Sequence, residues 1–323
     1  MFYSRKKITL IAIAAILIGV ASFFIWRLTP VSADSMLRSA VIIEETSWQE
    51  VTVDGKPCLY FASAEGDSIL IGVTTIRDSA IHRNYSTGFW HSRSWAYPSC
   101  HGRIATITAP RHRTLRNAAD TLVLRLCAEA TERELKVLEH QKDELAYYMR
   151  SHGVQDHGYQ QIAVLNDKVG REYIGVKRAQ EKLNALLHGK HKVAVNRRSK
   201  YVAVFRNEEG HLTRLPLRYI PNSTNLQGIT TLQTMDASTP SGVTPLHISP
   251  FAARHKRDII AIGFPSIGEP GLECDTVSPQ MVPGRESASG CHDIPPLLAG
   301  NGAPVFTKKG MFVGFLNGKK IYQ

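Results

Sequence analysis

Residues 299–306 (AGNGAPVF) hold the best candidates for a chemical site in this chain. Gly300 and Gly302 flank Asn301, so the backbone can turn sharply and lift the central side chain outward. Backbone N–H groups of such a turn can converge on one point, which suits an oxyanion hole with a nucleophile at its centre. An asparagine amide has no oxygen that a histidine could activate. We therefore take Gly300, Asn301, Gly302 and Ala303 as binding residues without an assigned catalytic one.

Four segments of the C-terminal part follow one another in the pattern of a known family. They are DIIAIGFP (258–265), VPGR (282–285), AGNGAPVF (299–306) and GMFVGF (310–315). In order and spacing they resemble the C-terminal barrel of trypsin-like serine peptidases. The resemblance implies a mainly β fold, a trypsin-like (chymotrypsin-fold) double β-barrel, and in a typical member a Ser-His-Asp triad.

The triad positions implied by the resemblance lack the required side chains. Pro304 and Val305 align with the family's Pro-Val, which places Asn301 at the nucleophile position. Gly228 occupies the aspartate position, and the strand 69–77, taken as the one that should end in the histidine, contains none. The resemblance thus identifies a degenerate member that lacks the catalytic triad.

Two other interpretations stay open. The chain could be an active membrane-anchored serine endopeptidase whose catalytic residues are displaced from the aligned positions. It could also be an unrelated β-rich domain, since Asn-Gly is a common hairpin turn and needs no site to explain it.

Histidine and aromatic side chains gather between residues 82 and 112. The histidine spacings fit no standard ligand set, so we expect surface histidines, no metal site and no cofactor. The histidines are His82, His91, His101 and His112. We expect the aromatic side chains to pack in the core or over a barrel, with an exposed peptide- or glycan-binding patch as the alternative. They are Tyr85, Phe89, Trp90, Trp95 and Tyr97.

The stretch from Ile8 to Trp26 contains no charged side chain. As a helix with a rise of about 1.5 Å per residue, it is long enough to cross the hydrocarbon core. Basic residues cluster before it at 5–7, so the positive-inside rule predicts a cytosolic N-terminus and a periplasmic or otherwise extracytoplasmic bulk. Cleavage after Ala33, as in a signal peptide, is the alternative to a retained single-pass anchor.

Charge and cysteine content agree with an exported globular protein. The net charge of +11 is spread along the chain, which indicates a solvated basic surface and no nucleic-acid partner. None of the five cysteines forms a CxxC pair. Disulfides could join Cys274 to Cys291 and Cys58 to Cys100, with free buried thiols as the alternative. Cys127 lies within a helical pattern and is expected to be unpaired.

A helical segment interrupts a β-rich chain. Residues 114–151 contain no glycine or proline and carry leucines at helical spacing. A second pattern of apolar and charged residues runs over 159–187, where Gly170 and Gly175 weaken the helix. The two predict a helical hairpin, although their imperfect heptads do not support a long coiled coil. The expected parts are a cytosolic tail (1–7), a transmembrane anchor (8–27), a linker (28–36), an N-terminal β part (37–112), the hairpin insertion (113–189) and a C-terminal β part (190–323).

These features predict an exported, membrane-anchored pseudo-peptidase. Its expected role is binding or scaffolding at the cell envelope, where the peptidase-like part holds a protein or peptide partner. The hairpin is expected to mediate association, including a possible homo-oligomer. A structural component of an envelope complex is a further alternative.

Overall fold

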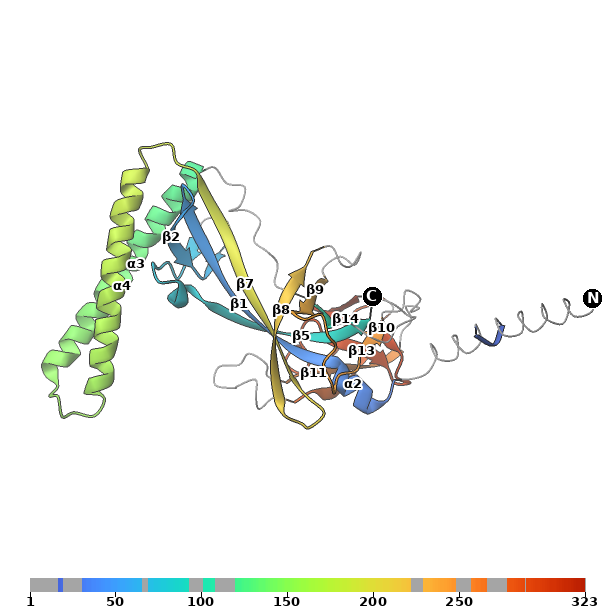
Figure 1. Cartoon of the computed structure of the whole chain (residues 1–323). Helices are drawn as coiled ribbons and strands as arrows, with labels where there is room; N and C mark the ends of the chain where they lie inside the picture. The colour runs from blue at the N-terminus through green and yellow to red at the C-terminus, as the bar shows by residue number, and fades with distance from the viewer. Residues whose placement is uncertain are drawn as a thin grey trace, which may run out of the picture. The chain divides into compact units, whose positions relative to one another are not determined.

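The structure is a computed structural model, and it describes residues 17–19, 31–65, 69–92, 101–107, 120–221, 229–247, 257–265, 278–287 and 289–322 (Figure 1). The chain divides into two compact units. Unit 1 comprises Met1–Ile43, Tyr85–Thr108 and Val202–Gln323, and unit 2 comprises Glu44–Asn84 and Ala109–Tyr201. The Asn301 segment therefore belongs to unit 1 and the helical hairpin to unit 2.

Six strands form a closed barrel. Each strand is hydrogen-bonded to the next in the order β1, β5, β6, β9, β8 and β7, and the ring closes because β7 pairs with β1 and β1 also pairs with β5. The strands are β1 (Ala40–Val53), β5 (His82–Ser92), β6 (Arg103–Thr106), β7 (Val193–Arg206), β8 (Leu212–Ile220) and β9 (Thr230–Thr234). A closed barrel leaves no unpaired edge, which confirms that a β-barrel underlies this fold.

The second β element of unit 1 is a five-stranded antiparallel sheet. Its order is β12 (Gln280–Glu286), β11 (Arg257–Gly263), β13 (Pro304–Thr307), β14 (Phe312–Asn317) and β15 (Lys320–Tyr322). Isolated bridges from Glu286 to His292 and from Cys291 to Lys320 connect its two edge strands through the segment between them.

The expected second closed barrel is not shown and stays a prediction. Among the described residues there is one closed barrel and one five-stranded sheet with bridged edges. The short strand β10 (Leu246–His247) pairs in parallel with β5 at residues His91 and Ser92, and so belongs to the first sheet.

An apolar core joins the two β elements within unit 1. Phe89 of β5 lies with its ring centroid 5.3 Å from that of Phe312 and 6.3 Å from that of Phe315. Trp90, on the other face of β5, packs edge-on against Phe205 at 5.4 Å. Both Phe89 and Trp90 are fully buried, which confirms core packing for these two aromatic residues. Trp95 and Tyr97 lie outside the described residues.

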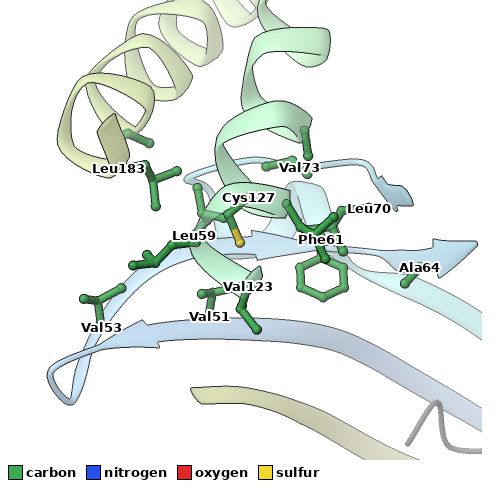
Figure 2. Packing of buried hydrophobic residues seen from close by; sticks show 14 residues of the cluster. Val51, Val53, Leu59, Phe61, Ala64, Leu70, Val73, Val123, Cys127 and Leu183 are labelled. Carbon is green, nitrogen blue, oxygen red and sulfur yellow. The ribbon is translucent and has the colours of Figure 1, made fainter. Parts of the chain in front are cut away.

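Unit 2 contains the predicted helical hairpin. Helix α3 (Asp120–Ser151) and helix α4 (Tyr159–Leu186) pack along one another (Figure 1). Their inner ends cover a small sheet in which β2 (Lys56–Phe61) pairs with β1 (Figure 2). The shorter elements are β3 (Ser63–Glu65), β4 (Ile69–Ile71) and the 3-10 turn Arg77–Ala80. Gly175, inside α4, is required by close packing, because a Cβ there would lie 2.4 Å from Thr75 Oγ1.

One strand is longer than the sequence pattern predicts. The polar run 196–200 separates two apolar stretches, yet β7 is continuous from Val193 to Arg206. Arg197 explains this, because its Nη2 donates to Glu45 Oε1 at 2.8 Å. The Tyr201 hydroxyl donates to the same oxygen at 3.1 Å, so a buried carboxylate of β1 is satisfied by the polar side of β7.

The predicted N-terminal features fall largely outside the described residues. Only residues 17–19 of the apolar run are described, and they are helical. Within the described part of the chain, no helix has the length and apolar character needed to span a membrane. The last residues of the predicted linker form helix α2 (Ala33–Ser39), capped by the Ser32 side chain.

Candidate active-site loop

We call the loop before β13 the Asn301 loop (residues 299–303). It is positioned by the preceding turn and by the end of β11. The N–H groups of Leu298 and Ala299 both donate to Pro295 O, at 3.0 and 3.3 Å. Gly263 at the end of β11 permits this approach, since a Cβ there would lie 2.2 Å from Leu298 O. The glycine of the IGFP segment is therefore a packing requirement of the loop.

Gly302 fixes the loop against the barrel. Its φ is +87°, and a Cβ at this position would lie 1.9 Å from Thr87 O of β5. The Thr87 N–H in turn donates to Asn301 O at 3.2 Å. Thr106 Oγ1 donates to Thr87 O at 2.8 Å, so β6 supports the same contact. Only glycine fits between the loop and the barrel strand here.

The loop uses its hydrogen-bonding groups internally. Gly302 N–H donates to Leu316 O at 2.8 Å, and Ala303 N–H donates to Gly300 O at 3.2 Å. The Asn301 side chain accepts from Gly318 N–H through Oδ1, also at 2.8 Å. The sequence pattern suggested that N–H groups of this loop converge on a developing negative charge. The N–H groups of Gly302 and Ala303 instead bind oxygens of the protein itself.

The side chains around the contact between Gly302 and β5 carry hydroxyl groups. Ser86 Oγ lies 3.2 Å from Thr106 Oγ1. Thr87 Oγ1 is buried and has no hydrogen-bond partner within the described residues. Hydroxyl groups alone, without an adjacent base, are weak nucleophiles at neutral pH.

The titratable side chain connected to the Asn301 loop is His292. Its Nε2 lies 3.0 Å from Gly318 O, and Ile294 N–H donates to its Nδ1 at 3.2 Å. This geometry requires the neutral ring with the proton on Nε2. Burial lowers the pKa of His292, and the hydrogen bond to Gly318 O partly offsets that. Because both ring nitrogens are engaged, His292 is arranged to hold the turn at Gly318 and not to accept a proton from a nucleophile.

The other positions drawn from the resemblance lie on another element or outside the described residues. Gly228 lies outside the described residues. In the strand predicted at 69–77, β4 covers only Ile69–Ile71 and pairs with β3. The barrel strand that precedes the hairpin is β6, which pairs with β5 and β9 and contains no histidine.

The histidine prediction needs one correction. His91 is buried on β5, because that strand is covered on both faces, whereas a surface position was expected. His82 and His101 are exposed, and His112 lies outside the described residues. In the described ranges, no three side chains of the metal-ligating types His, Cys, Asp and Glu are grouped to hold an ion.

The cysteines can be placed only in part. Cys58, Cys127 and Cys291 carry free thiols. Cys100 and Cys274 lie outside the described residues, so the Cys58–Cys100 and Cys274–Cys291 disulfides stay predictions.

An apolar cavity of about 110 Å³ lies elsewhere in unit 1. Its walls come from α2, β1, β7 and β8, together with Phe264 and Pro279. Arg38 and Arg206 line it as well, and both are exposed. The Arg38 guanidinium pairs with Asp34 at 2.9 Å, which engages this charge locally.

Comparison with known proteins adds little. No family model matches the sequence. No curated protein sequence matches it either. Among solved structures, the chain is similar to the one in the crystal structure of Deg5, with a TM-score of 0.32 and 9% sequence identity. The alignment covers 84% of this chain and 77% of that chain, but a TM-score this low assigns neither fold nor activity.

Proposed function

We propose that this protein is a non-catalytic relative of the trypsin-like peptidases that binds a protein or peptide partner at the cell envelope. The observation that carries the proposal is the closed hydrogen bonding of the Asn301 loop. Asn301 Oδ1 is held by Gly318 N–H and Gly302 N–H is held by Leu316 O. A loop of peptidase-like sequence is thereby used as a structural connection.

Acyl transfer requires a nucleophile, a base and free donors for the oxyanion. The Asn301 amide supplies no nucleophile, and His292 has both ring nitrogens engaged. The N–H groups of Ala299, Gly302 and Ala303 all donate inside the protein. Each group is satisfied where a catalytic site would keep it available. This supports a holding role for the domain.

The predicted anchor supports a location at the envelope, and the hairpin supports an association surface. Export through the apolar run from Ile8 to Trp26 would present both units outside the cytosol. The outer half of the hairpin, residues 132–172, exposes large apolar side chains that a soluble two-helix pair does not need. Tyr147 is 68% exposed, Val154 62% and Val164 70%. These side chains support association with a protein partner or a second copy of the chain.

A fluorophosphonate probe tests the absence of catalysis. We expect the full-length chain, purified in detergent, to remain unlabelled. Asn301→Ser should remain unlabelled too, because no base among the described residues is arranged to activate a serine at that position. Labelling of the unmodified chain that a single serine substitution removes would establish an active peptidase. Labelling gained only in Asn301→Ser would reveal a working His/Asp pair and contradict the proposal.

Cross-linking in intact membranes tests the binding role. We expect a cross-linked species with unmodified protein that is lost when Tyr147, Val154 and Val164 are all changed to serine. The matched control changes exposed charged residues of the same hairpin half, Lys136 and Glu139, to serine. Equal cross-linking in all three proteins would exclude the hairpin as the association surface.

A further inference from the structure

Cys58 is placed by an irregularity in the β1–β2 ladder. Leu59 pairs with Val51, whereas the next pair along is Pro57 with Thr52, so Cys58 has no opposite residue. This is a β-bulge, which re-aims the side chain of the extra residue. Leu59 faces the helices, and Cys58 packs against the same buried cluster. The bulge therefore turns the Cys58 thiol toward the helical side of the sheet.

Cys127 approaches the same cluster from the helix. It is fully buried on the inner part of α3, between Val123 and Ala130 along the helix. Figure 2 shows its sulfur pointing from α3 toward the sheet that carries Leu59 and Phe61. Two thiols from segments far apart in the sequence thus face one small apolar cluster.

The electrostatics of the two thiols indicate the same closeness. Burial, together with a charge on the neighbouring Cys58, raises the pKa of Cys127 to about 12. Burial also raises the pKa of Cys58, and the ammonium of Lys182 from α4 partly offsets this. Cys58 is half-buried, so of the two it is the thiol that an external reagent can reach.

We propose that Cys58 and Cys127 are a cross-linking site, whose disulfide ties β2 to α3. The oxidant is a small or protein disulfide of the glutathione or thiol–disulfide oxidoreductase class. The Cys58 thiolate attacks one sulfur of that disulfide, which releases one thiol and leaves a mixed disulfide on Cys58. Cys127 then loses its proton and attacks the Cys58 sulfur, which releases the second thiol. Two protein thiols are oxidised and one external disulfide is reduced to two thiols.

The order of the two attacks follows from burial. Cys127 is shielded from reagents, and its pKa near 12 leaves very little thiolate. Once Cys58 is in the mixed disulfide, its charge no longer opposes ionisation of Cys127. The result would lock the inner end of the hairpin onto the sheet, and it would exclude the Cys58–Cys100 pairing expected from the sequence.

Peptide mapping after oxidation tests the pair. The full-length chain in detergent is incubated with oxidised glutathione, its remaining thiols are blocked with N-ethylmaleimide, and it is digested without reduction. We expect a linked peptide pair containing Cys58 and Cys127. While the pH is below the pKa of Cys58, its rate of formation should rise about tenfold for each unit of increase in pH, because the thiolate is the attacking species.

Single variants separate this pairing from others. In Cys127→Ala we expect Cys58 to stop at the glutathione mixed disulfide, and in Cys58→Ser we expect no linked peptide. Cys291→Ala, which removes a half-buried thiol from unit 1, should leave the link intact. If Cys127→Ala fails to fold, the unmodified chain and Cys58→Ser still decide the outcome. A Cys58–Cys100 link, a glutathione adduct as the final product, or N-ethylmaleimide on both cysteines would overturn the proposal.

Discussion

The Asn301 loop and the outer half of the helical hairpin differ in which groups they leave exposed. The loop binds its polar groups within the protein, whereas the hairpin leaves apolar side chains in solvent. In the loop, short hydrogen bonds join Asn301 and Gly302 to the strands and turn that follow. The buried cluster between the two helices that supports this outer half consists of Leu138, Val169 and Val176 with three partly buried neighbours. Large apolar side chains of the same segment remain exposed.

The difference bears on the proposed function. A region that performs chemistry keeps polar groups free for the substrate, whereas the loop has satisfied its own. A region that serves only as a connection has no need of exposed valine and tyrosine, yet the hairpin presents them. The contrast favours binding by the hairpin over chemistry at the loop.

The largest expected effect is that of Gly302→Ala. The positive φ and the overlap with Thr87 O make a Cβ incompatible with the loop, so we expect more than about 4 kcal/mol of lost stability or failure to fold. Urea unfolding followed by circular dichroism measures this. Gly300→Ala is the matched control, since a Cβ there meets open space. Similar losses in both variants would show that the loop is not locked against β5.

Leu138→Ala probes the thin core of the hairpin. The side chain is 4% exposed, and its truncation should cost about 2 kcal/mol, at the lower end of the range for buried leucine because a two-helix pair can close around the gap. Hydrogen exchange across α3 and α4 is the measurement. Val137→Ala, next to it and half-exposed, should change exchange little. An equal response at both positions would mean that another segment already covers the outer half.

Asn301→Ala tests the hydrogen bond that defines the loop. Loss of the acceptor for Gly318 N–H should cost about 1 kcal/mol in urea unfolding. Asn301→Asp replaces the amide oxygen with a carboxylate oxygen that can accept the same hydrogen bond, and should retain most of that stability. If Asn301→Ala proves as stable as the unmodified chain, the amide is not structural and its chemistry would need another explanation.

His292 makes the loop sensitive to acid. Its pKa is lowered in the folded protein, so the unfolded chain takes up the proton first. The contribution to stability is therefore complete above the unfolded pKa of about 6.5 and is lost as the pH falls below it through the folded value. Thermal unfolding from pH 8 to pH 5 measures this small effect. His292→Gln, which retains a donor for Gly318 O, should flatten that part of the profile, and an unchanged profile would assign the sensitivity to other groups.

The smallest effect on stability is expected for Val164→Ser. The side chain is 70% exposed, so urea unfolding should shift by less than about 0.5 kcal/mol. Sedimentation velocity in detergent should nevertheless show weaker association of the full-length chain if this face binds a second copy. Lys168→Ser on the same helix is the control. Unchanged association in both variants, together with unchanged cross-linking, would contradict the proposed association through the outer half of the hairpin.

Local sequence patterns predicted much of this fold. Apolar residues at helical spacing identified α3 and α4, because helical periodicity is a short-range property, and this held for α4 despite its Gly170 and Gly175. The Gly-Asn-Gly sequence located a sharp turn followed by the strand β13. The polar run 196–200 gives no local sign of a strand, because Glu45 of β1, which binds its Arg197, is remote in sequence.

The sequence by itself determined the hairpin, the turn at Gly302 and the absence of a nucleophile at Asn301, since each depends on residue type and close neighbours. Only the tertiary structure decided that the Asn301 loop is closed, because its partners Thr87, Leu316 and Gly318 come from other elements. The same holds for the facing thiols of Cys58 and Cys127, which a bulge and a helix bring to one cluster. Hydrogen-bond partners and cross-strand neighbours are set by long-range packing, which no local pattern records.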